Sequence, residues 1–489
     1  MANNGQRTKG PGVKGELWSA SASELAMGVA AGEFSSREVV ESCLGRIDAV
    51  NGEINAIVEV HAEEALSAAD QADRKVAAGE ELGPLHGVPV TTKINSDQAG
   101  KATTDGVVAL KDNIAAVDSP QVGGLLRAGG ISVGRTNTPA FSYRWFTEND
   151  LHGKTLNPWS AGHTPGGSSG GASAATAAGL APICHGNDLG GSIRYPAHAC
   201  GVVGLRPTIG RVANNHRHAD QDVPLSVELF GVDGPLARTV PDIRLAMEAM
   251  TAPDPRDAIH VPGAPAAVPA ATPTRVALVR DVGAAAPTPE VNAALDQAAA
   301  WLGDAGYIVE EAAVPALEEA WKLWWLLCLE EFRLVMPLVD QVGDEGMKEC
   351  ARGYYAAAAE WHGEKPTLEQ LMRGYARRST LIEMLSVFMD DNPIVLLPIS
   401  AEPVFEQDLD QRGVETVRRM VAAQWSQMAI PIFGSPAIAV PTGVANGLPM
   451  GVQLLGRRFG EEDILTAAEA IEAQAGVITP VDPFSGSGA

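Results

Sequence analysis

Two serines lie in separate glycine-rich runs of this chain, and either could act as a nucleophile. Ser168 lies in the GGSSGG run of residues 166–171, and Ser192 lies in the DLGGSIR run of residues 188–194. Glycines let a backbone approach a ligand closely, and successive N–H groups beside a serine can point at one oxygen. An oxyanion hole for acyl transfer needs that arrangement. Taken singly, each run is better interpreted as a tight turn between a strand and a helix.

Together with a third run, the two serine segments resemble the hallmark of the amidase signature family. That hallmark is GGSSGG, then a D-x-GGSIR-x-P element, then CG-x-x-GL-[KR]-PT, and the chain matches it at residues 166–171, 188–196 and 200–208. The likeness extends upstream to residues 87–90 and downstream to residues 449–453, so it covers nearly the whole chain. It implies a hydrolase that cleaves the C–N bond of a carboxamide or a related acyl compound, such as an anilide or hydrazide.

The resemblance also implies a role for three residues. Ser192 resembles the family's nucleophile, Ser168 its bridging serine held after a cis peptide bond, and Lys93 its base, because the family places a lysine just after a Gly-Val-Pro strand. Lysine in water has a pKa of roughly 10.4, so keeping it neutral near pH 7 costs about 4 to 5 kcal/mol, which burial can supply. Lys93 is therefore expected to be desolvated and without a charged partner.

The implied mechanism is a serine acyl-enzyme. Lys93 draws a proton through Ser168 from Ser192, whose oxygen attacks the carbonyl carbon, and Ser168 then protonates the leaving nitrogen. By resemblance, the oxyanion is held by the backbone amides of the loop Leu189, Gly190, Gly191 and Ser192. No metal and no organic cofactor is expected.

A rival interpretation makes Ser169 the nucleophile. Residues 167–171 also fit G-x-S-x-G, the nucleophile elbow of α/β-hydrolases. The elbow requires a strand that runs straight into it, whereas residues 161–165 are small, polar and broken by glycine and proline. This interpretation also leaves the second serine run and Lys93 without a function.

Polar and sulfur-containing residues near the signature are interpreted as structural. His185 and His198 match no common metal-ligand spacing, so packing or surface roles are expected for both. Asp188 and Arg194 flank Ser192 and are expected to form an ion pair that holds the loop. Cys184 and Cys200 are expected to be small core residues.

Two aromatic groups could line an acyl pocket. The first is in residues 141–147, where the resemblance places contacts with the acyl group, and it predicts an aryl or apolar acyl chain. Its candidate binding residues are Tyr143, Trp145, Phe146 and Thr147. The second falls at helical spacing, which is more typical of core, although part of it is expected near the cleft: Trp321, Trp324, Trp325 and Phe332.

An alternative function is that of a glutamine-hydrolysing subunit of a tRNA-dependent amidotransferase, which shares the family's fold and catalytic residues. The aromatic segment argues against it. So does Tyr195, which stands where that subunit usually has glutamine.

The elements that must position these residues are typical of an α/β protein, with a mixed central β-sheet covered by helices on both sides. Short apolar runs at residues 88–92, 131–134, 276–279, 394–397, 437–440 and 450–454 are typical of strands, and residues 17–80, 317–375 and 463–472 have helical spacing. The expected organisation is a flexible tail (1–15) and a single domain (16–480), divided into a helical entry (16–82), a catalytic core (83–253), a variable substrate-shaping region (254–395) and a return to the core (396–480).

Composition limits the partners of the protein. Its 36 lysines and arginines against 60 aspartates and glutamates give a formal charge of −24, so the surface should repel nucleic acid and anionic membranes. No apolar run is long enough to span a bilayer. The five cysteines are odd in number and lack CxxC spacing, which predicts reduced thiols and a cytoplasmic location. The expected partner is a small amide-type substrate, and a homodimer is left open.

Overall fold

A mixed sheet of eleven strands forms the centre of the molecule. The computed structural model describes residues 15–216, 222–263 and 272–484, so the predicted tail lies outside the described residues except for Gly15. The strand order is β1-β3-β2-β6-β8-β7-β12-β13-β11-β9-β10. Parallel pairs, such as β2 with β3 and β6, stand beside antiparallel pairs such as β12 with β13. The predicted mixed α/β sheet is confirmed.

The strands span β1 (Ile57–Val60), β2 (Pro89–Lys93), β3 (Ile131–Thr136), β6 (Ile183–Asp188), β7 (Val203–Arg206), β8 (Val232–Ala237), β9 (Arg275–Leu278), β10 (Ile308–Glu311), β11 (Ile394–Pro398), β12 (Ala437–Ala445) and β13 (Leu448–Gly456). A separate two-stranded sheet pairs β4 (Glu148–Asn149) with β5 (Gly153–Lys154). The six strand segments predicted from apolar runs all coincide with strands of the central sheet.

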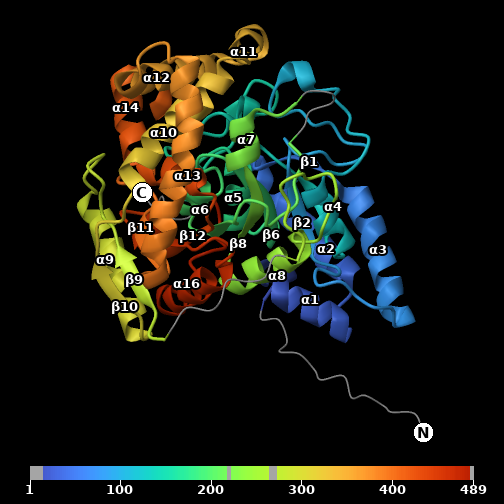
Figure 1. Ribbon diagram of the computed structural model, residues 1–489. Helices are drawn as coiled ribbons and strands as arrows, with labels where there is room; N and C mark the ends of the chain where they lie inside the picture. Colours follow the sequence, from blue (N-terminus) through green and yellow to red (C-terminus); the bar gives the residue numbers. More distant parts are fainter. Residues whose placement is uncertain (1–14, 217–221, 264–271, 485–489) are drawn as a thin grey trace.

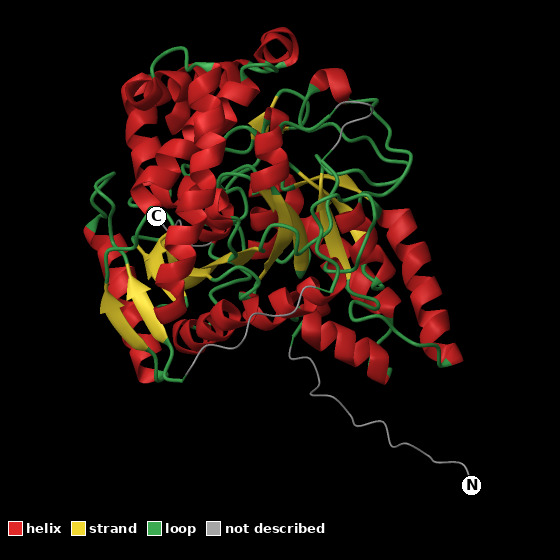
Figure 2. Ribbon diagram, viewed as in Figure 1, coloured by secondary structure: helices red, strands yellow, loops and turns green. Residues whose placement is uncertain are grey.

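Two hydrophobic cores lie on opposite faces of the sheet, because successive side chains of a strand point to opposite faces. In β11, Ile394 and Leu396 join one core, and Val395 and Leu397 join the other. Both faces are therefore apolar, which requires helices on both sides. Figure 2 shows the strands in yellow within a shell of red helices.

The helices divide between the two cores. The smaller core is covered by α1 (Ala22–Ala31), α4 (Pro120–Arg127), α8 (Val240–Met250), α9 (Pro289–Asp304) and α16 (Glu461–Ala475). The larger core contains residues of α2 (Ser36–Ile54), α3 (Ala62–Ala78), α5 (Gly170–Ala177), α6 (Arg194–Cys200), α7 (Leu225–Phe230), α10 (Leu317–Phe332), α12 (Glu345–His362), α13 (Leu368–Asp391), α14 (Val414–Ala423) and α15 (Trp425–Phe433).

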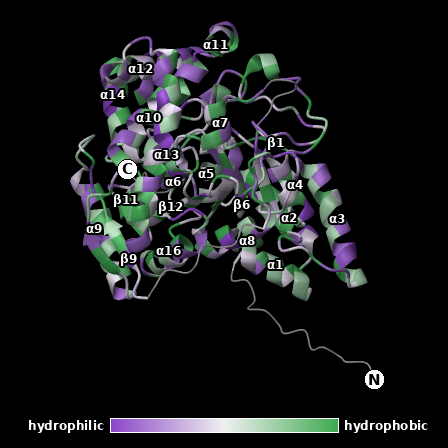
Figure 3. Ribbon diagram, viewed as in Figure 1, coloured by the Kyte–Doolittle hydropathy of each residue, from purple (hydrophilic) through white to green (hydrophobic). Residues whose placement is uncertain are grey.

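Helix α11 (Met336–Val342) packs in a small separate cluster at the top of the view in Figure 1, above the stack that contains α10, α12 and α13. Short 3₁₀ helices complete the secondary structure: η1 (Leu17–Ser19), η2 (Val108–Leu110), η3 (Ala140–Ser142) and η4 (Leu409–Gln411). Outer helices such as α3 carry hydrophilic and hydrophobic residues on different sides (Figure 3).

The N-terminal segment differs from its prediction. Helical spacing predicted helix across residues 17–80, but Ile57–Val60 forms β1, which pairs antiparallel with β3 at one edge of the sheet. The pairing supplies the hydrogen bonds of β1 from a strand that is distant along the chain, and no local pattern encodes such a partner. Helix α2 begins with a capping box, in which Ser35 and Glu38 satisfy each other's backbone N–H groups.

Candidate active site

Lys93 is the last residue of β2 and lies beneath the glycine-rich loops. Its strand lies between β3 and β6, and its side chain is fully buried. Nζ donates to Oγ of Ser168 and to Oδ1 of Asn187, both at 2.7 Å. Burial lowers the pKa of Lys93 to about 7, while the charge of Asp105 opposes that shift. Lys93 is thus desolvated, as predicted, and among the described residues it has no ion pair.

Ser168 occupies the turn that leads into α5. The Gly167–Ser168 peptide bond is cis, as the family resemblance implied. The Ser168 carbonyl accepts a hydrogen bond from Oγ1 of Thr138 at 3.0 Å, which ties the turn to the segment after β3. Gly171 allows α5 to come close to that segment, because a Cβ there would lie 2.4 Å from the backbone nitrogen of Asn137. These contacts place the Ser168 hydroxyl over the end of β2.

Asn187 joins Lys93 to a polar chain that the sequence did not reveal. Its Nδ2 donates to Oδ1 of Asn95 at 3.0 Å, and Nδ2 of Asn95 donates to Oγ of Ser142 at 2.9 Å. The Ser142 hydroxyl donates in turn to Asp105 at 2.7 Å. Asn187 directly precedes Asp188 and Asn95 follows Lys93 by two residues, so nearness to the motifs was the available signal.

The Ser192 loop connects the end of β6 to α6, at the same sheet edge as Lys93. Strands β2 and β6 are parallel neighbours, and ligands of open α/β sheets bind at the carboxyl ends of such strands. The predicted ion pair is present: Arg194 donates to both carboxylate oxygens of Asp188 at 3.0 Å. Burial opposes the charge of Asp188, but Arg194 and Arg206 hold the pKa of its carboxyl far below the usual range.

The backbone of this loop is held on both sides. The N–H of Gly191 donates to Oδ1 of Asp188 at 3.0 Å, so this amide, expected to face an oxyanion, is engaged by the carboxylate. The carbonyls of Leu189 and Gly190 accept from Nε1 of Trp324 at 2.9 Å and Nε1 of Trp145 at 3.0 Å. Within the described chain, the N–H groups of Gly190 and Ser192 donate to no protein acceptor.

Ser168 and Ser192 open into one cavity of about 340 Å³, within the ~300–1,000 Å³ that is typical of small-molecule sites. Of the first aromatic group, Tyr143 and Trp145 line the cavity. Phe146 is fully buried, and Thr147 donates to the carbonyl of Gly166 at 2.9 Å. The cavity wall therefore excludes Phe146 and Thr147, two of the four residues expected there.

The second aromatic group contributes more to this cavity than its helical spacing indicated. Trp324, Trp325 and Phe332 of α10 line it, whereas Trp321 packs against Trp361 with ring centroids 4.6 Å apart. Apolar side chains, contributed largely by α7, α11 and α12, form much of the rest of the described lining: Val227, Leu329, Val335, Met336, Leu338, Val339, Met347 and Tyr354. Polar side chains line it as well, namely Asn95, Asp105, Ser142, Asn187, Asp188, His216 and Asp222.

Ser169 stands apart from this cavity. It is fully buried, its hydroxyl donates to the carbonyl of Asn187 at 3.3 Å, and it precedes the first turn of α5. Residues 161–168 form turns and bends without a strand, so the elbow that a Ser169 nucleophile requires is not formed.

The two histidines near the signature are both buried. Nδ1 of His185 accepts from the backbone N–H of Lys93 at 3.3 Å, and its Nε2 lies 2.8 Å from Asp233. His185 thus supports the end of β2, a more specific role than the predicted packing. Burial lowers the pKa of His198 to about 4. No group of histidine, cysteine or acidic side chains suited to a metal ion occurs in the described ranges.

The cysteines are core residues. Cys184 and Cys200 are buried as predicted, and Cys43, Cys328 and Cys350 are buried free thiols as well. In the described part of the chain, no helix combines the length and apolar character needed to cross a membrane.

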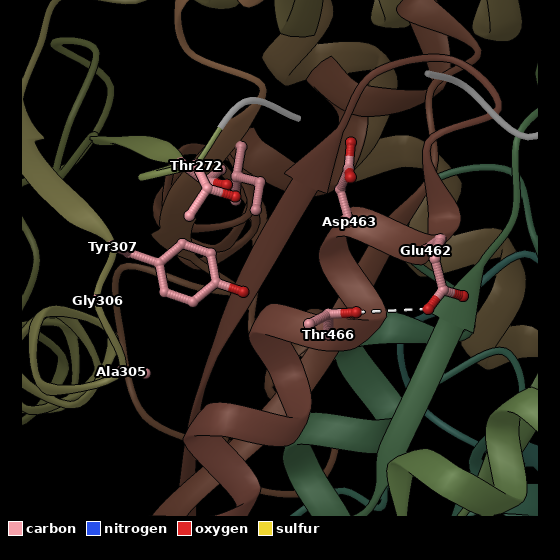
Figure 4. A pocket seen from close by; sticks show the side chains of 9 residues that line it. Thr272, Ala305, Gly306, Tyr307, Glu462, Asp463 and Thr466 are labelled. Carbon is pink, nitrogen blue, oxygen red and sulfur yellow. Dashed lines mark hydrogen bonds between the residues drawn. The ribbon is translucent and has the colours of Figure 1, made fainter. Parts of the chain in front are cut away.

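A second hollow of about 320 Å³ lies away from these residues, between the β9–β10 edge of the sheet and α16 (Figure 4). Tyr307 faces α16 across it, and Thr466 donates to Glu462 at 3.4 Å. Glu462 also pairs with Arg244, and Asp463 pairs with Arg457 at 2.7 Å. These acidic groups are neutralised within the fold, and the hollow contains none of the predicted site residues.

Known proteins resemble this chain over almost its full length. The family model described as Amidase matches residues 38–465. An indoleacetamide hydrolase of Bradyrhizobium diazoefficiens is 40% identical over 474 residues, which cover 95% of this chain and 88% of that protein. One chain of a glutamyl-tRNA(Gln) amidotransferase from Salinispora tropica is 33% identical, covering 95% of this chain and 99% of that protein.

A solved structure resembles the fold equally broadly. A bacterial aryl acylamidase of the amidase signature enzymes superposes with a TM-score of 0.78 at 26% identity, covering 95% of this chain and 97% of that one. The eleven-stranded sheet and the helices around it therefore have a known counterpart.

Proposed function

Because this chain belongs to the amidase family, whose members hydrolyse C–N amide bonds, we propose that it hydrolyses aromatic carboxamides through a serine acyl-enzyme. One observation carries the proposal: a fully buried lysine with a pKa of about 7 lies 2.7 Å from a serine that shares a cavity with a second serine. A lysine whose pKa lies near physiological pH is partly uncharged there, so it can act as a base.

In the proposed mechanism Ser192 is the nucleophile and Ser168 relays its proton to Lys93. A neutral amine has two N–H groups and one lone pair, and Oδ1 of Asn187 can only accept, so one N–H points to Asn187. In the neutral amine the lone pair faces Ser168, so the 2.7 Å contact, which an ammonium would donate, is donated by the Ser168 hydroxyl instead. Lys93 then accepts the Ser168 proton as Ser168 takes that of Ser192. The Oγ–C bond forms while the C=O electron pair moves to oxygen.

The tetrahedral anion then collapses. The C–N bond breaks as Ser168 returns the proton to the leaving nitrogen, releasing ammonia or an amine and leaving the acyl group on Ser192. Water attacks the ester by the same proton route in reverse, and the free acid departs. We assign the oxyanion to the Leu189–Ser192 loop, where the N–H groups of Gly190 and Ser192 have no protein acceptors among the described residues.

The cavity supports an aromatic acyl group. Tyr143, Trp145, Trp325 and Tyr354 form a cluster of rings whose centroids lie between 5.0 and 6.4 Å apart, and aromatic pairs at such distances stabilise one another. A planar aromatic ligand fits a wall of this kind. The similarity to an indoleacetamide hydrolase points to an arylacetamide as the substrate type.

The test is a panel of indole-3-acetamide, phenylacetamide, benzamide, acetanilide, benzoyl hydrazide, propionamide and glutamine, with released amine and acid measured for each. We expect the arylacetamides to be hydrolysed fastest. Ser192→Ala should lose at least ~10³-fold in kcat, the scale seen when a catalytic nucleophile is removed. Ser169→Ala is the matched control, because its hydroxyl lies outside the cavity. Full activity of Ser192→Ala would overturn the nucleophile.

A second candidate is glutamine hydrolysis for a tRNA-dependent amidotransferase, which the similarity to the Salinispora tropica protein favours. Glutamine carries an α-ammonium and an α-carboxylate, and both need polar partners when buried. Asp105 and Asp222 line the cavity and could meet the ammonium, but no lysine or arginine is among the described lining residues to meet the carboxylate. Glutamine hydrolysis by the purified chain, faster than hydrolysis of every aromatic amide, would decide for this candidate.

A further inference from the structure

Two tryptophans hold the backbone of the loop that precedes Ser192. Nε1 of Trp324 donates to the carbonyl of Leu189 at 2.9 Å, and Nε1 of Trp145 donates to the carbonyl of Gly190 at 3.0 Å. The two donors come from distant parts of the chain, one from α10 and one from the segment after η3. Consecutive carbonyls of one loop are thus held by separate indoles.

These bonds set the direction of the amides that follow. In a trans peptide the C=O and the next N–H point in opposite directions. Because Trp324 holds the Leu189 carbonyl, the next N–H, that of Gly190, points away from α10. Because Trp145 holds the Gly190 carbonyl, the N–H of Gly191 points away from the Trp145 indole, and it reaches Oδ1 of Asp188 at 3.0 Å. The carbonyl and the N–H of the Gly190–Gly191 peptide are thus both held, by Trp145 and by Asp188. The N–H of Gly190 stays free of any acceptor among the described residues and points away from the Trp324 indole.

Packing reinforces the hydrogen bonds. A Cβ added to Gly190 would lie 2.8 Å from Cζ2 of Trp324, so the indole lies directly on the glycine. On the other side, a Cβ added to Gly191 would lie 2.5 Å from Oε1 of Gln427 on α15. The loop is therefore enclosed between α10 and α15, and glycine is required at both positions.

The two indoles share a support. Trp325 meets the ring of Trp324 edge-on with centroids 4.9 Å apart, and the ring of Trp145 edge-on at 6.4 Å. Trp325 is buried and lines the cavity with them. The cavity wall and the two N–H donors thus form one rigid aromatic unit.

We propose that Trp324 and Trp145 are positioning residues for the oxyanion: Trp324 orients the N–H of Gly190, which has no acceptor among the described residues, and Trp145 fixes the loop in that orientation by holding the Gly190–Gly191 peptide against Asp188. The inference rests on the proposed assignment of Ser192 as nucleophile. It separates two functions of the same rings: their faces bound the acyl cavity, and their N–H groups prepare the loop for the transition state.

The test removes each N–H and keeps an aromatic ring, with Trp324→Phe and Trp145→Phe assayed on the best amide of the panel. Removing one oxyanion donor costs about 10²–10³-fold in kcat. A donor that is displaced but still present should cost less, about 5- to 50-fold for each variant, with KM changed by less than about threefold. Trp321→Phe is the matched control, because Trp321 lies on α10, its Nε1 has no partner among the described residues, and it is outside the cavity lining.

A second readout is independent of the amide substrate. A fluorophosphonate labels an active serine as the Oγ–P bond forms, the P–F bond breaks and fluoride leaves with the serine proton, and its phosphoryl oxygen occupies the oxyanion position. The second-order labelling rate, followed by intact-protein mass spectrometry, should fall in parallel with kcat in both variants. Trp324→Tyr and Trp145→Tyr replace any phenylalanine variant that does not give a cooperative thermal transition.

The outcomes are distinguishable. Label found on a serine other than Ser192, or none on the wild-type protein, would refute the proposed nucleophile and the inference with it. Label on Ser192 at equal rates in wild-type and variant proteins, with kcat unchanged and only KM raised, would overturn the positioning role alone and leave the indoles as cavity wall.

Discussion

Lys93 shows how a common residue acquires an uncommon property. Its side chain is fully buried among groups that are mainly uncharged, and burial penalises the ammonium form. Ser168 and Asn187 satisfy its hydrogen bonds without stabilising a full positive charge as a carboxylate would. The largest opposing influence is the charge of Asp105, which is linked to Asn187 through the hydrogen bonds of Asn95 and Ser142.

The activity should therefore depend on pH through Lys93. Below its pKa the lysine is protonated and cannot accept a proton, so kcat/KM should rise with pH through about 7 and level off above it. The Asp105 carboxylate stabilises the ammonium form and raises the pKa, so Asp105→Asn should move this limb to lower pH. The measurement is a pH profile of kcat/KM, and Asp112→Asn, an exposed site, is the control. A shift to higher pH would contradict the assignment.

Asp188 is the second residue whose surroundings determine its contribution, in this case to the stability of the protein. Its carboxylate accepts from the N–H groups of Gly191 and Ile193 and from the guanidinium groups of Arg194 and Arg206, all fully buried. Removing one partner of a buried ion pair leaves an uncompensated charge.

Asp188→Ala should consequently lower the free energy of unfolding by about 3–5 kcal/mol. Urea titration followed by fluorescence gives that value. The half-buried Asp70, which pairs with Arg37 at 2.9 Å near the surface, offers the comparison, since Asp70→Ala should cost at most about 1 kcal/mol. Equal losses in the two variants would show that the Asp188 network contributes no more than a surface pair.

At the scale of elements, the site depends on close contact between α5 and the sheet. All eight residues of α5 are buried and small, and Gly171 faces backbone atoms of Asn137 and Ala56. Small side chains here bring Ser168 over the end of β2. A larger residue must push the helix outward, because the atoms it meets belong to the backbone.

Gly171→Ala should therefore destabilise the protein by about 1–3 kcal/mol and reduce kcat by displacing Ser168. Gly45 in the exposed middle of α2 is the opposite case, because a Cβ there meets nothing within 4 Å. Gly45→Ala should stabilise by about 0.5–1 kcal/mol and leave kcat unchanged. Thermal midpoints and steady-state assays of the pair test both signs, and a stabilised Gly171→Ala would mean that α5 can shift freely.

At the scale of the whole molecule, the formal charge of −24 is the dominant electrostatic feature. Like charges over a folded surface repel one another, and salt screens that repulsion. Salt also weakens attractive surface ion pairs, such as Arg377–Glu319 at 2.7 Å, and this loss offsets part of the stabilisation that screening the repulsion brings. The repulsion should prevail, since acidic groups exceed basic ones by 24 (60 less 36).

The thermal midpoint should accordingly rise when sodium chloride is raised from about 20 mM to about 500 mM, beyond which the Debye length is only a few ångströms. Differential scanning fluorimetry across this range measures it. A midpoint that falls with salt would show that ion pairs contribute more than net repulsion costs. The domain boundaries, the cytoplasmic location, the absence of nucleic-acid binding and the homodimer stay predictions.

Much of the candidate site could be located from the sequence because its residues lie in short local motifs. The GGSSGG and GGSIR runs specify tight loops whose backbone geometry needs glycine within a few residues. Lys93 ends the strand that an apolar run predicted, and the family resemblance singled it out as the base. The same holds for much of the sheet, since apolar runs predicted strands such as β2, β3 and β12. The Asp188–Arg194 pair spans six residues and was equally accessible.

The tertiary structure decided what distant segments bring together. Trp324 reaches Leu189 across 135 residues, and Phe146 and Thr147 turn away from the cavity although their neighbours Tyr143 and Trp145 line it. Spacing along a chain shows which residues share a face of an element, but not which surface that face meets. The sequence by itself thus determined which groups could do chemistry, while long-range packing decided which aromatic rings enclose the cavity and which strand forms the edge of the sheet.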